Sequence, residues 1–219
     1  GTASELAEIP CADLAVMLVL NPNSVNPFEP VRDEMLTRAK VPMTKEEVRW
    51  VSVARLGVQP GDTVWDVGAG TGAVTFELAR KAMDGAVFAV ERNTEAIELI
   101  AQNRQKLGGF NVHIVQGHAP EVLADLPRPN CVFVGGSGGN MREIIETALV
   151  KNPKARIAVN AIALETLQET QRLFAEFGLQ QVEITQLSAA RGKSIGCYTM
   201  MTANNPVFIL SGKGAKYGE

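Results

Sequence analysis

The residues best suited to chemistry are a run of glycines and two carboxylates. An apolar stretch reaches Asp66 and runs into Gly68-Ala69-Gly70-Thr71-Gly72, in which three glycines alternate. Alternating glycines let the backbone turn sharply and bring bare amides against a ligand. A second apolar stretch ends in Glu91, about 20 residues beyond the turn, where a carboxylate accepts hydrogen bonds from both hydroxyls of a ribose. The pattern predicts a site for a cofactor that contains adenosine.

Two kinds of cofactor fit this turn. The stretch from Gly68 to Ala73 satisfies the dinucleotide fingerprint with alanine in the last place, so a nicotinamide or flavin site is one interpretation. A carboxylate at Asp66 would repel a pyrophosphate, whereas it suits the cationic methionine end of S-adenosyl-L-methionine. Because the glycines alternate through Gly72, the turn is wide, and its amides do not close tightly around a phosphate. The residues therefore favour S-adenosyl-L-methionine.

Strands and helices alternate through most of the chain. The apolar spacing predicts strands Thr63–Val67, Ala86–Val90, Asn111–Val115, Cys131–Val134, Arg156–Val159, Gln181–Leu187 and Pro206–Leu210, and helices Ala73–Ala82, Thr94–Leu107, Pro120–Leu126, Met141–Val150 and Leu164–Phe177. This alternation predicts an α/β fold with a mostly parallel sheet and helices on both of its faces.

The carboxyl ends of the predicted strands carry polar groups. Ligands of such sheets bind beyond these ends. Five of the ends hold glycine, carboxylate or amide groups, at Asp66–Gly72, Glu91–Asn93, Gly117–Pro120, Gly135–Gly139 and Asn160. Folding alone does not account for this concentration, so we expect these groups to form one site.

Two segments precede the alternating pattern. Thr44-Lys45-Glu46-Glu47 has the form of a capping box, in which the Thr44 hydroxyl accepts from the Glu47 amide and Glu47 reaches back, so a helix should start here. Upstream, the apolar run Leu14–Leu20 is too short to span a bilayer and predicts a buried strand. A stretch rich in turn formers follows that run. We expect residues 1–27 to be the remnant of a preceding domain plus a linker, and residues 28–219 to form the cofactor-binding domain.

Composition restricts the classes of partner. The net charge of −3 provides no basic field to attract nucleic acid, and no apolar run is long enough to cross a membrane. Three widely spaced cysteines, Cys11, Cys131 and Cys197, predict reduced and mostly buried thiols in a cytoplasmic protein. Only two histidines are present and no spacing suits metal ligands, so we predict no metal site.

Six segments occur in an order that resembles one enzyme family. They are Val41-Pro42-Met43-Thr44-Lys45-Glu46-Glu47-Val48-Arg49, the Asp66–Gly72 turn, Glu91-Arg92-Asn93, Ala119-Pro120-Glu121, Gly135-Gly136-Ser137-Gly138-Gly139 and Asn205-Pro206-Val207. This order is similar to that of the decarboxylating precorrin and cobalt-precorrin C15-methyltransferases of cobalamin biosynthesis. The likeness covers about residues 28–212. Its most specific part is the Gly-Gly-Ser-Gly-Gly turn combined with the Pro-x-Thr segment.

The resemblance implies a fold, a reaction and an assembly. The fold is the Rossmann-like class I S-adenosylmethionine-dependent methyltransferase fold, a mostly parallel seven-stranded sheet with a reversed last strand. The reaction is methyl transfer from S-adenosyl-L-methionine to C15 of a corrinoid precursor, with decarboxylation of the acetate arm on C12. Some members carry this domain fused behind a C5-methyltransferase domain, and the family often forms tetramers. We therefore expect a homo-oligomer, with a tetramer favoured.

The resemblance also implies residue roles. Thr44 and the turn Gly68, Ala69, Gly70, Thr71 and Gly72 contact the methionine end of the cofactor, near Asp66. Glu91 holds the ribose. The backbone of His118 and Ala119 meets the adenine, although a role for His118 as a proton carrier is the alternative.

The substrate carries many carboxylates, so cationic and amide groups should line its pocket. The candidates are Ser137, Asn160, Arg191 and Lys193. The alternative for Arg191-Gly192-Lys193 is a solvated loop between the last two strands. No catalytic side chain is identified, because a sulfonium is already a strong electrophile and catalysis is then mainly positioning in a dry pocket.

Other classes of function remain alternatives. A methyltransferase of RNA or DNA could share the cofactor half, but Gly135-Gly136-Ser137 stands where amino-group methylation uses an Asn/Asp-Pro-Pro-aromatic motif, and no basic stripe is present. A nicotinamide-dependent oxidoreductase fits the turn alone. A non-catalytic binding module is compatible with the fold, since fold alone does not give function.

Overall fold

The computed structural model describes residues 29–215 together with residues 5, 9, 10, 16, 18, 20 and 26. Its helices are the 3-10 helices η1 (Asp33–Met35) and η2 (Glu121–Asp125) and the α-helices α2 (Glu46–Leu56), α3 (Ala73–Lys81), α4 (Thr94–Leu107), α5 (Met141–Lys151) and α6 (Leu164–Glu176). Its strands are β1 (Thr63–Val67), β2 (Ala86–Glu91), β3 (Val112–Gln116), β4 (Cys131–Val134), β5 (Arg156–Ala161), β6 (Gln180–Leu187), β7 (Ala190–Ile195), β8 (Tyr198–Ala203) and β9 (Val207–Lys213).

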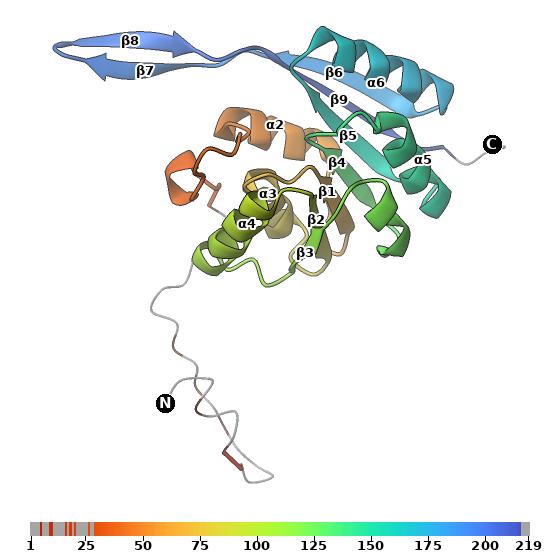
Figure 1. Ribbon diagram of the computed structural model, residues 1–219, viewed down its shortest axis with the longest axis horizontal. Coiled ribbons are helices and arrows are strands. Elements are labelled where there is room, and N and C mark those ends of the chain that lie inside the picture. The colour runs from red at the N-terminus through yellow and green to blue at the C-terminus, as the bar shows by residue number, and fades with distance from the viewer. Residues whose placement is uncertain are drawn as a thin grey trace.

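The main sheet has seven strands in the order β3-β2-β1-β4-β5-β9-β6 (Figure 1). The pairs from β3 to β5 are parallel, whereas β9 is antiparallel to both β5 and β6. The predicted α/β fold and its seven-stranded, mostly parallel sheet with a reversed last strand are therefore confirmed. The order reverses direction between β1 and β4, and ligand crevices of doubly wound sheets open at such a switch point.

Two apolar cores lie on opposite faces of the sheet. Successive side chains of a strand point to opposite faces, and the cores divide along β1 in this way, with Val64 in one and Trp65 in the other. Trp65 is fully buried, and its indole N–H donates to the Pro127 carbonyl (3.1 Å). All four residues of β4 are buried, as expected for a strand covered by helices on both faces.

The start of α2 differs from the prediction. Lys45 rather than Thr44 is the N-cap residue, and no side chain caps the helix. The capping box is therefore wrong, because the Glu47 carboxylate pairs with a distant arginine instead of the first amides of its own helix.

The segment expected to be a loop before the last strand is a β-hairpin. Strands β7 and β8 pair from Ala190↔Ala203 to Ile195↔Tyr198 and project from the main sheet (Figure 1). Gly196 and Cys197 form the turn between them, and Gly196 has the positive φ of 63° that such turns require. Cys197 is consequently exposed, which corrects the prediction of a buried thiol, while Cys131 is buried as predicted. Cys11 lies outside the described residues.

The N-terminal run is not the predicted buried strand where it is described. Val16, Leu18 and Leu20 lie outside any helix or strand and are exposed. The other residues of Leu14–Leu20 lie outside the described part of the chain.

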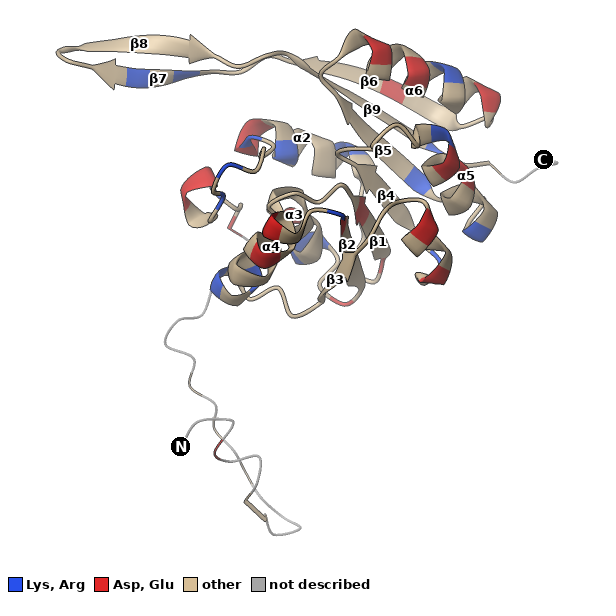
Figure 2. Ribbon diagram, in the orientation of Figure 1, with Lys and Arg blue, Asp and Glu red and all other residues tan. Residues whose placement is uncertain are grey.

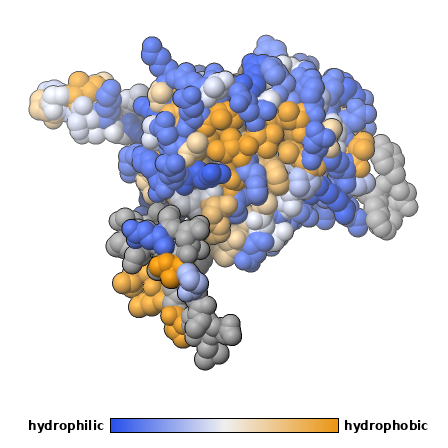
Figure 3. Space-filling model, turned by 60° about the horizontal axis from the view of Figure 1, so that its bottom comes forward, coloured by the Kyte–Doolittle hydropathy of each residue, from blue (hydrophilic) through white to orange (hydrophobic). Residues whose placement is uncertain are grey.

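The surface combines mixed charge with apolar areas. Basic and acidic residues are interspersed on α5 and α6 (Figure 2). The face drawn in Figure 3 carries a broad apolar area framed by hydrophilic side chains. Across the described residues, no helix is long and apolar enough to span a bilayer.

We predict that a variant lacking residues 1–27 folds and melts within about 3 °C of the full chain, because the sheet and both cores are built from residues beyond this segment. Differential scanning calorimetry checks this. A variant lacking residues 1–36 is the matched control and should be severely destabilised, since it removes the fully buried Val31. Equal loss of stability in both variants would place residues 1–27 in the folded core.

Candidate functional site

A cavity of about 650 Å³ lies at the carboxyl edge of the parallel strands. Its lining includes eleven of the residues predicted for the site, namely Thr44, Asp66, Gly68, Ala69, Gly70, Thr71, Glu91, His118, Ala119, Ser137 and Asn160. Strand ends far apart in the sequence thus meet at one place. Gly72 does not line the cavity. A side chain there would lie 2.8 Å from the ring of Phe76, so this glycine is required by packing against the core.

The glycine turn after β1 is pressed against the loop after β4. Gly68 has a φ of 75°, and a Cβ at this position would lie 2.6 Å from the Gly136 carbonyl oxygen. Only glycine fits this backbone conformation and this close approach. The two loops therefore form one continuous wall of backbone with space for a ligand against it.

Glu91 organises the turn from the end of β2. Its Oε2 accepts from the Gly70 amide (2.9 Å), and its Oε1 accepts from the amides of Arg92 (2.8 Å) and Asn93 (2.9 Å). Each carboxylate oxygen has two acceptor positions, so Oε2 keeps one for a hydroxyl in the cavity. The carboxylate thus fixes the turn and still faces the ligand space.

Asp66 is a buried carboxyl at the end of β1. Its Oδ2 accepts from the Thr75 hydroxyl at 2.5 Å. Burial raises the pKa of Asp66 to about 7, the Thr75 hydrogen bond opposes this rise, and the nearby charge of Glu91 adds to it. The group therefore changes charge near neutral pH, in the wall of the cavity.

Two polar side-chain atoms in the cavity wall have no hydrogen-bond partner among the described residues. They are the Thr71 hydroxyl and Asn160 Nδ2. Asn160 Oδ1 accepts from the Ser52 hydroxyl (2.9 Å), and this hydrogen bond orients the side chain at the end of β5. Buried polar groups are rarely left unpaired, and these two are therefore available to a bound molecule.

The loops after β3 and β4 are joined. Asn140 Nδ2 donates to the Ala119 carbonyl (2.9 Å), and the Ser137 hydroxyl accepts from the Gly139 amide (3.4 Å). Among the described residues, no group of three or more His, Cys, Asp or Glu side chains could hold a metal ion.

Residues 40–45, here called the cover segment, line the side of the cavity next to α2. A buried arginine holds this segment in place. Arg49 is 0% exposed, and it donates to the Thr44 carbonyl, to Asp33 Oδ1 and to the Val31 carbonyl, each at 2.6 Å. Sequence reasoning missed Arg49, although a cation among the apolar positions of a helix is a usable signal.

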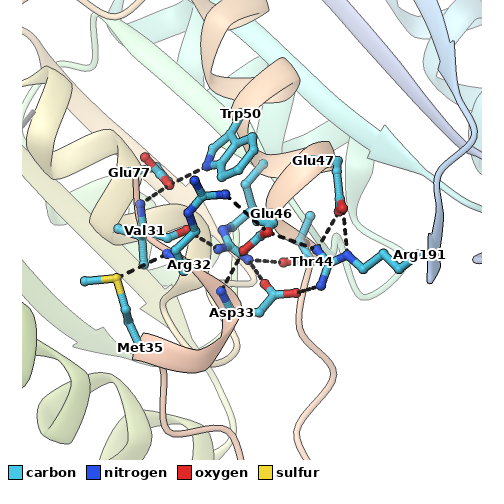
Figure 4. Close-up of polar contacts among 11 residues, drawn as sticks. Val31, Arg32, Asp33, Met35, Thr44, Glu46, Glu47, Trp50, Glu77 and Arg191 are labelled. Atoms are coloured by element: carbon cyan, nitrogen blue, oxygen red, sulfur yellow. Dashed lines mark hydrogen bonds and ion pairs between the residues drawn. The ribbon is translucent and has the colours of Figure 1, made fainter. Parts of the chain in front are cut away.

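Arg191 ties the hairpin to the same network (Figure 4). Its Nε and Nη2 donate to the two oxygens of Glu47 (2.6 Å each), and its Nη1 donates to Asp33 Oδ2 (2.9 Å). The hairpin base also lines the cavity through Ala189 and Asn204. Arg191 therefore joins two walls of the cavity at their edge.

The structure does not bring Arg191 and Lys193 to the cavity that the other predicted site residues line, so their substrate role stays a prediction. Both residues lie in β7 rather than in a loop, and neither lines the cavity. The Arg191 guanidinium is already paired with three carboxylates of its own chain, those of Asp33, Glu46 and Glu47, and Lys193 is exposed. The signal for this pairing is absent from local sequence, because the partners lie more than a hundred positions apart.

We predict that Arg191→Met lowers the melting temperature by about 2–4 °C at pH 7, since a half-exposed bidentate pair contributes about 1 kcal/mol. The hydrogen bond from Arg191 holds the pKa of Glu47 below its ordinary value of 4.5. A lowered carboxyl pKa gives stability that is present above pH 4.5 and is lost as the pH falls through the folded-state pKa. The difference between variant and wild type should therefore disappear in acid.

Thermal melts at several pH values check this, with Lys193→Met as the matched loss of one cation from the same strand. Lys193→Met should leave the melting temperature unchanged throughout. A deficit in Arg191→Met that persists below the pKa of Glu47 would show that the pair is not its source.

Known proteins resemble this chain over nearly all of its folded part. A model of the precorrin methyltransferase domain matches residues 37–213. A probable cobalt-precorrin-6B C(15)-methyltransferase (decarboxylating) of Pyrobaculum calidifontis is 42% identical over 184 residues, which are 83% of this chain and 94% of that protein.

Two solved structures are also similar. Precorrin-6Y C5,15-methyltransferase from Geobacter metallireducens superposes with a TM-score of 0.79 at 35% identity, and covers 84% of this chain and 97% of its own. Precorrin 8W decarboxylase from Methanobacterium thermoautotrophicum has a TM-score of 0.77 at 39% identity, over 84% of this chain and 100% of its own.

These likenesses agree with the cavity and its glycine turn. The predictions of the methyltransferase fold, of methyltransferase activity and of S-adenosyl-L-methionine as the cofactor are confirmed. The nicotinamide and RNA alternatives are not favoured. The chain belongs to the precorrin methyltransferase family.

Proposed function

We propose that this chain transfers a methyl group from S-adenosyl-L-methionine to C15 of a corrinoid precursor and removes the C12 acetate carboxylate as carbon dioxide. The observation that carries the proposal is 42% identity across 94% of a relative named for this reaction. The cavity supports it, because its wall combines a glycine cradle, two carboxylates and unpartnered polar atoms.

The residues fit the cofactor by their chemistry. When bound, S-adenosyl-L-methionine supplies an electrophilic methyl group on a sulfonium. Glu91 would accept from a ribose hydroxyl through the free position of Oε2, and the glycine turn would hold the methionine end beside Asp66 and Thr44. The loop at His118 and Ala119 would border the adenine.

The remaining wall would hold the macrocycle. Ser137, in the loop after β4, and Asn160, near the end of β5, also line the cavity, and we propose that they hold substrate carboxylates by donating hydrogen bonds. Fixing the macrocycle carbon in line with the methyl group converts an encounter into an oriented reaction, which is the main source of rate when the electrophile is already strong. The cover segment contributes by excluding water.

The decarboxylation needs no charged nucleophile from the protein. When the bond to the carboxylate carbon breaks, its electron pair passes into the conjugated macrocycle, and a proton later converts the arm to a methyl group. A carboxylate held by neutral amide and hydroxyl donors loses its charge more readily than one paired with a cation. Asn160 and Ser137 are neutral donors of this kind, which fits them to the step.

The resemblance to this family also suggests an oligomeric state and a cellular compartment for the chain. We extend the proposal to a homotetramer that acts in the cytoplasm, with residues 28–219 as the methyltransferase domain. Sedimentation of the full chain would test the tetramer.

The test of function is mass spectrometry of cobalt-precorrin-6B incubated with this chain and S-adenosyl-L-methionine. The expected product has gained one methyl group and lost one carbon dioxide. Product that is methylated yet keeps its carboxylate would overturn the second half of the proposal, and unchanged substrate would overturn both halves.

We predict that Glu91→Ala weakens S-adenosylhomocysteine binding by about 1.5–3 kcal/mol, the range for a charge-assisted hydrogen bond. The loss has two sources, the ribose contact and the Gly70 amide that Glu91 holds. Isothermal titration measures it. Glu98→Ala on α4, an exposed carboxylate outside the cavity lining, is the control and should bind normally. Unchanged affinity in Glu91→Ala would remove this carboxylate from the site.

We predict that affinity for S-adenosyl-L-methionine rises as the pH increases through about 7. The pKa of Asp66 is about 7, so its carboxyl is neutral below that pH and charged above it, and only the charged form attracts the cationic methionine end. Asp66→Asn should flatten this dependence. Titrations at a series of pH values check it, and His118→Ala should keep the wild-type slope. A flat wild-type profile would contradict the prediction.

A further inference from the structure

A shallow groove of about 360 Å³ continues from the cavity across the end of the sheet. It is lined by Ile162, Leu164, Gln186, Asn205, Pro206 and Phe208, here called the apolar groove. Ile162 and Asn205 line both spaces, so the groove and the cavity meet. No residue of the groove is charged.

The sheet itself builds the floor of the groove. Phe208 on β9 pairs with Ala161 on β5 and with Gln186 on β6, which places three neighbouring strands in register at this edge. Ile162 and Leu164 follow directly, where the chain leaves β5 and enters α6. The rigid sheet thus fixes the positions of the groove's side chains.

The groove exposes apolar surface next to a polar site. Ile162 is 63% exposed and Leu164 is 66% exposed. Leaving such side chains in water forgoes the free energy of burial, about 25 cal/mol for each Å². Apolar surface that adjoins a binding cavity is typical of a ligand groove.

The cavity lining has two parts, one proposed for the cofactor and one that adjoins the apolar groove. The residues proposed for the cofactor come from the cover segment and from the ends of β1, β2 and β3. The other half of the lining includes Ser137, Asn160 and Ile162. Because Ile162 and Asn205 line both the cavity and the groove, a ring held at Ser137 and Asn160 continues past Ile162 into the groove.

We propose that the apolar groove is the docking surface for the corrinoid ring of the substrate. This inference rests on the proposed function and assigns a subsite to it. Leu164, Ile162 and Phe208 contact the apolar carbons of the ring. The amides of Gln186 and Asn205 donate to the carboxylate arms at the ring's edge. The absence of acidic residues from the groove avoids repulsion of those arms.

The first experiment truncates one exposed side chain. Leu164→Ala should raise the KM for cobalt-precorrin-6B on the order of 10-fold, from lost apolar contact, while the Kd for S-adenosylhomocysteine stays unchanged. Leu164→Asp should raise KM further, because it adds repulsion. Val150→Ala, an aliphatic residue that is 77% exposed on α5, is the matched control and should leave KM unchanged.

Substitutions of opposite charge at Gln186 distinguish recognition of the acid arms from apolar contact with the ring. Gln186→Glu should raise KM, since a carboxylate faces the acid arms, and Gln186→Lys should hold or lower it. Gln186 is exposed in β6, so we expect both substitutions to leave the fold intact. Equal effects of Glu and Lys at this position would overturn the assignment of Gln186 to the arms.

A binding measurement distinguishes failure of the subsite from failure of the proposed function. Protein loaded with S-adenosylhomocysteine is titrated with cobyrinic acid, a stable corrinoid polycarboxylate, and the Leu164 variants should bind it more weakly than wild type. Weak wild-type binding and no turnover would contradict the proposed function. Normal turnover and equal corrinoid binding by Leu164→Asp would overturn the groove alone. A change in sedimentation without a change in KM would instead identify the groove as a contact between copies of the chain.

Discussion

A buried guanidinium holds the wall on which the cofactor cavity depends. Arg49 reaches two backbone carbonyls and the Asp33 carboxylate from a position with no exposure to solvent. Removing one member of a buried pair typically costs about 3–5 kcal/mol, because the remaining charge stays buried without a partner. The segment from Val31 to Thr44 has no strand or long helix of its own to position it. Arg49 therefore fixes this segment next to the glycine turn together with Glu77, Glu46 and Asn103, which accept from the segment's backbone amides.

Asp33 extends this constraint to the far end of the chain. One of its oxygens accepts from Arg49 and the other from Arg191, so a single carboxylate connects the buried network to the hairpin. The two guanidiniums differ in setting. Arg49 is enclosed, whereas the side chain of Arg191 is 38% exposed and is screened by solvent. The cover segment is thus fixed firmly on the side of α2, and the hairpin is attached by a weaker and salt-sensitive contact.

Sequence predicted the parts of the site that are local and missed those that are not. The turn after β1, Glu91, and the loops at His118 and Ser137 are each readable, because the carboxyl end of a strand is set by the apolar run before it. The sequence predicts a substrate role for Arg191 because it is a cation between the last two predicted strands and the substrate carries many carboxylates. Its real partners, Glu47 and Asp33, become neighbours only when β7 folds back over α2. The same contact removed Glu47 from the capping box.

Several groups in the cavity wall are unfavourable for folding and suited to binding a ligand. Asp66 remains in a buried position that raises its pKa, and Thr71 and Asn160 keep polar atoms unpaired among the described residues. Each arrangement is unfavourable for folding alone. All three residues line the cavity at the carboxyl edge of the sheet, where β1, β4 and β5 lie side by side. The packed cores on both faces of the sheet stabilise the fold enough to tolerate such groups. These polar groups therefore stay at the carboxyl edge without being paired by the chain's own hydrogen bonds.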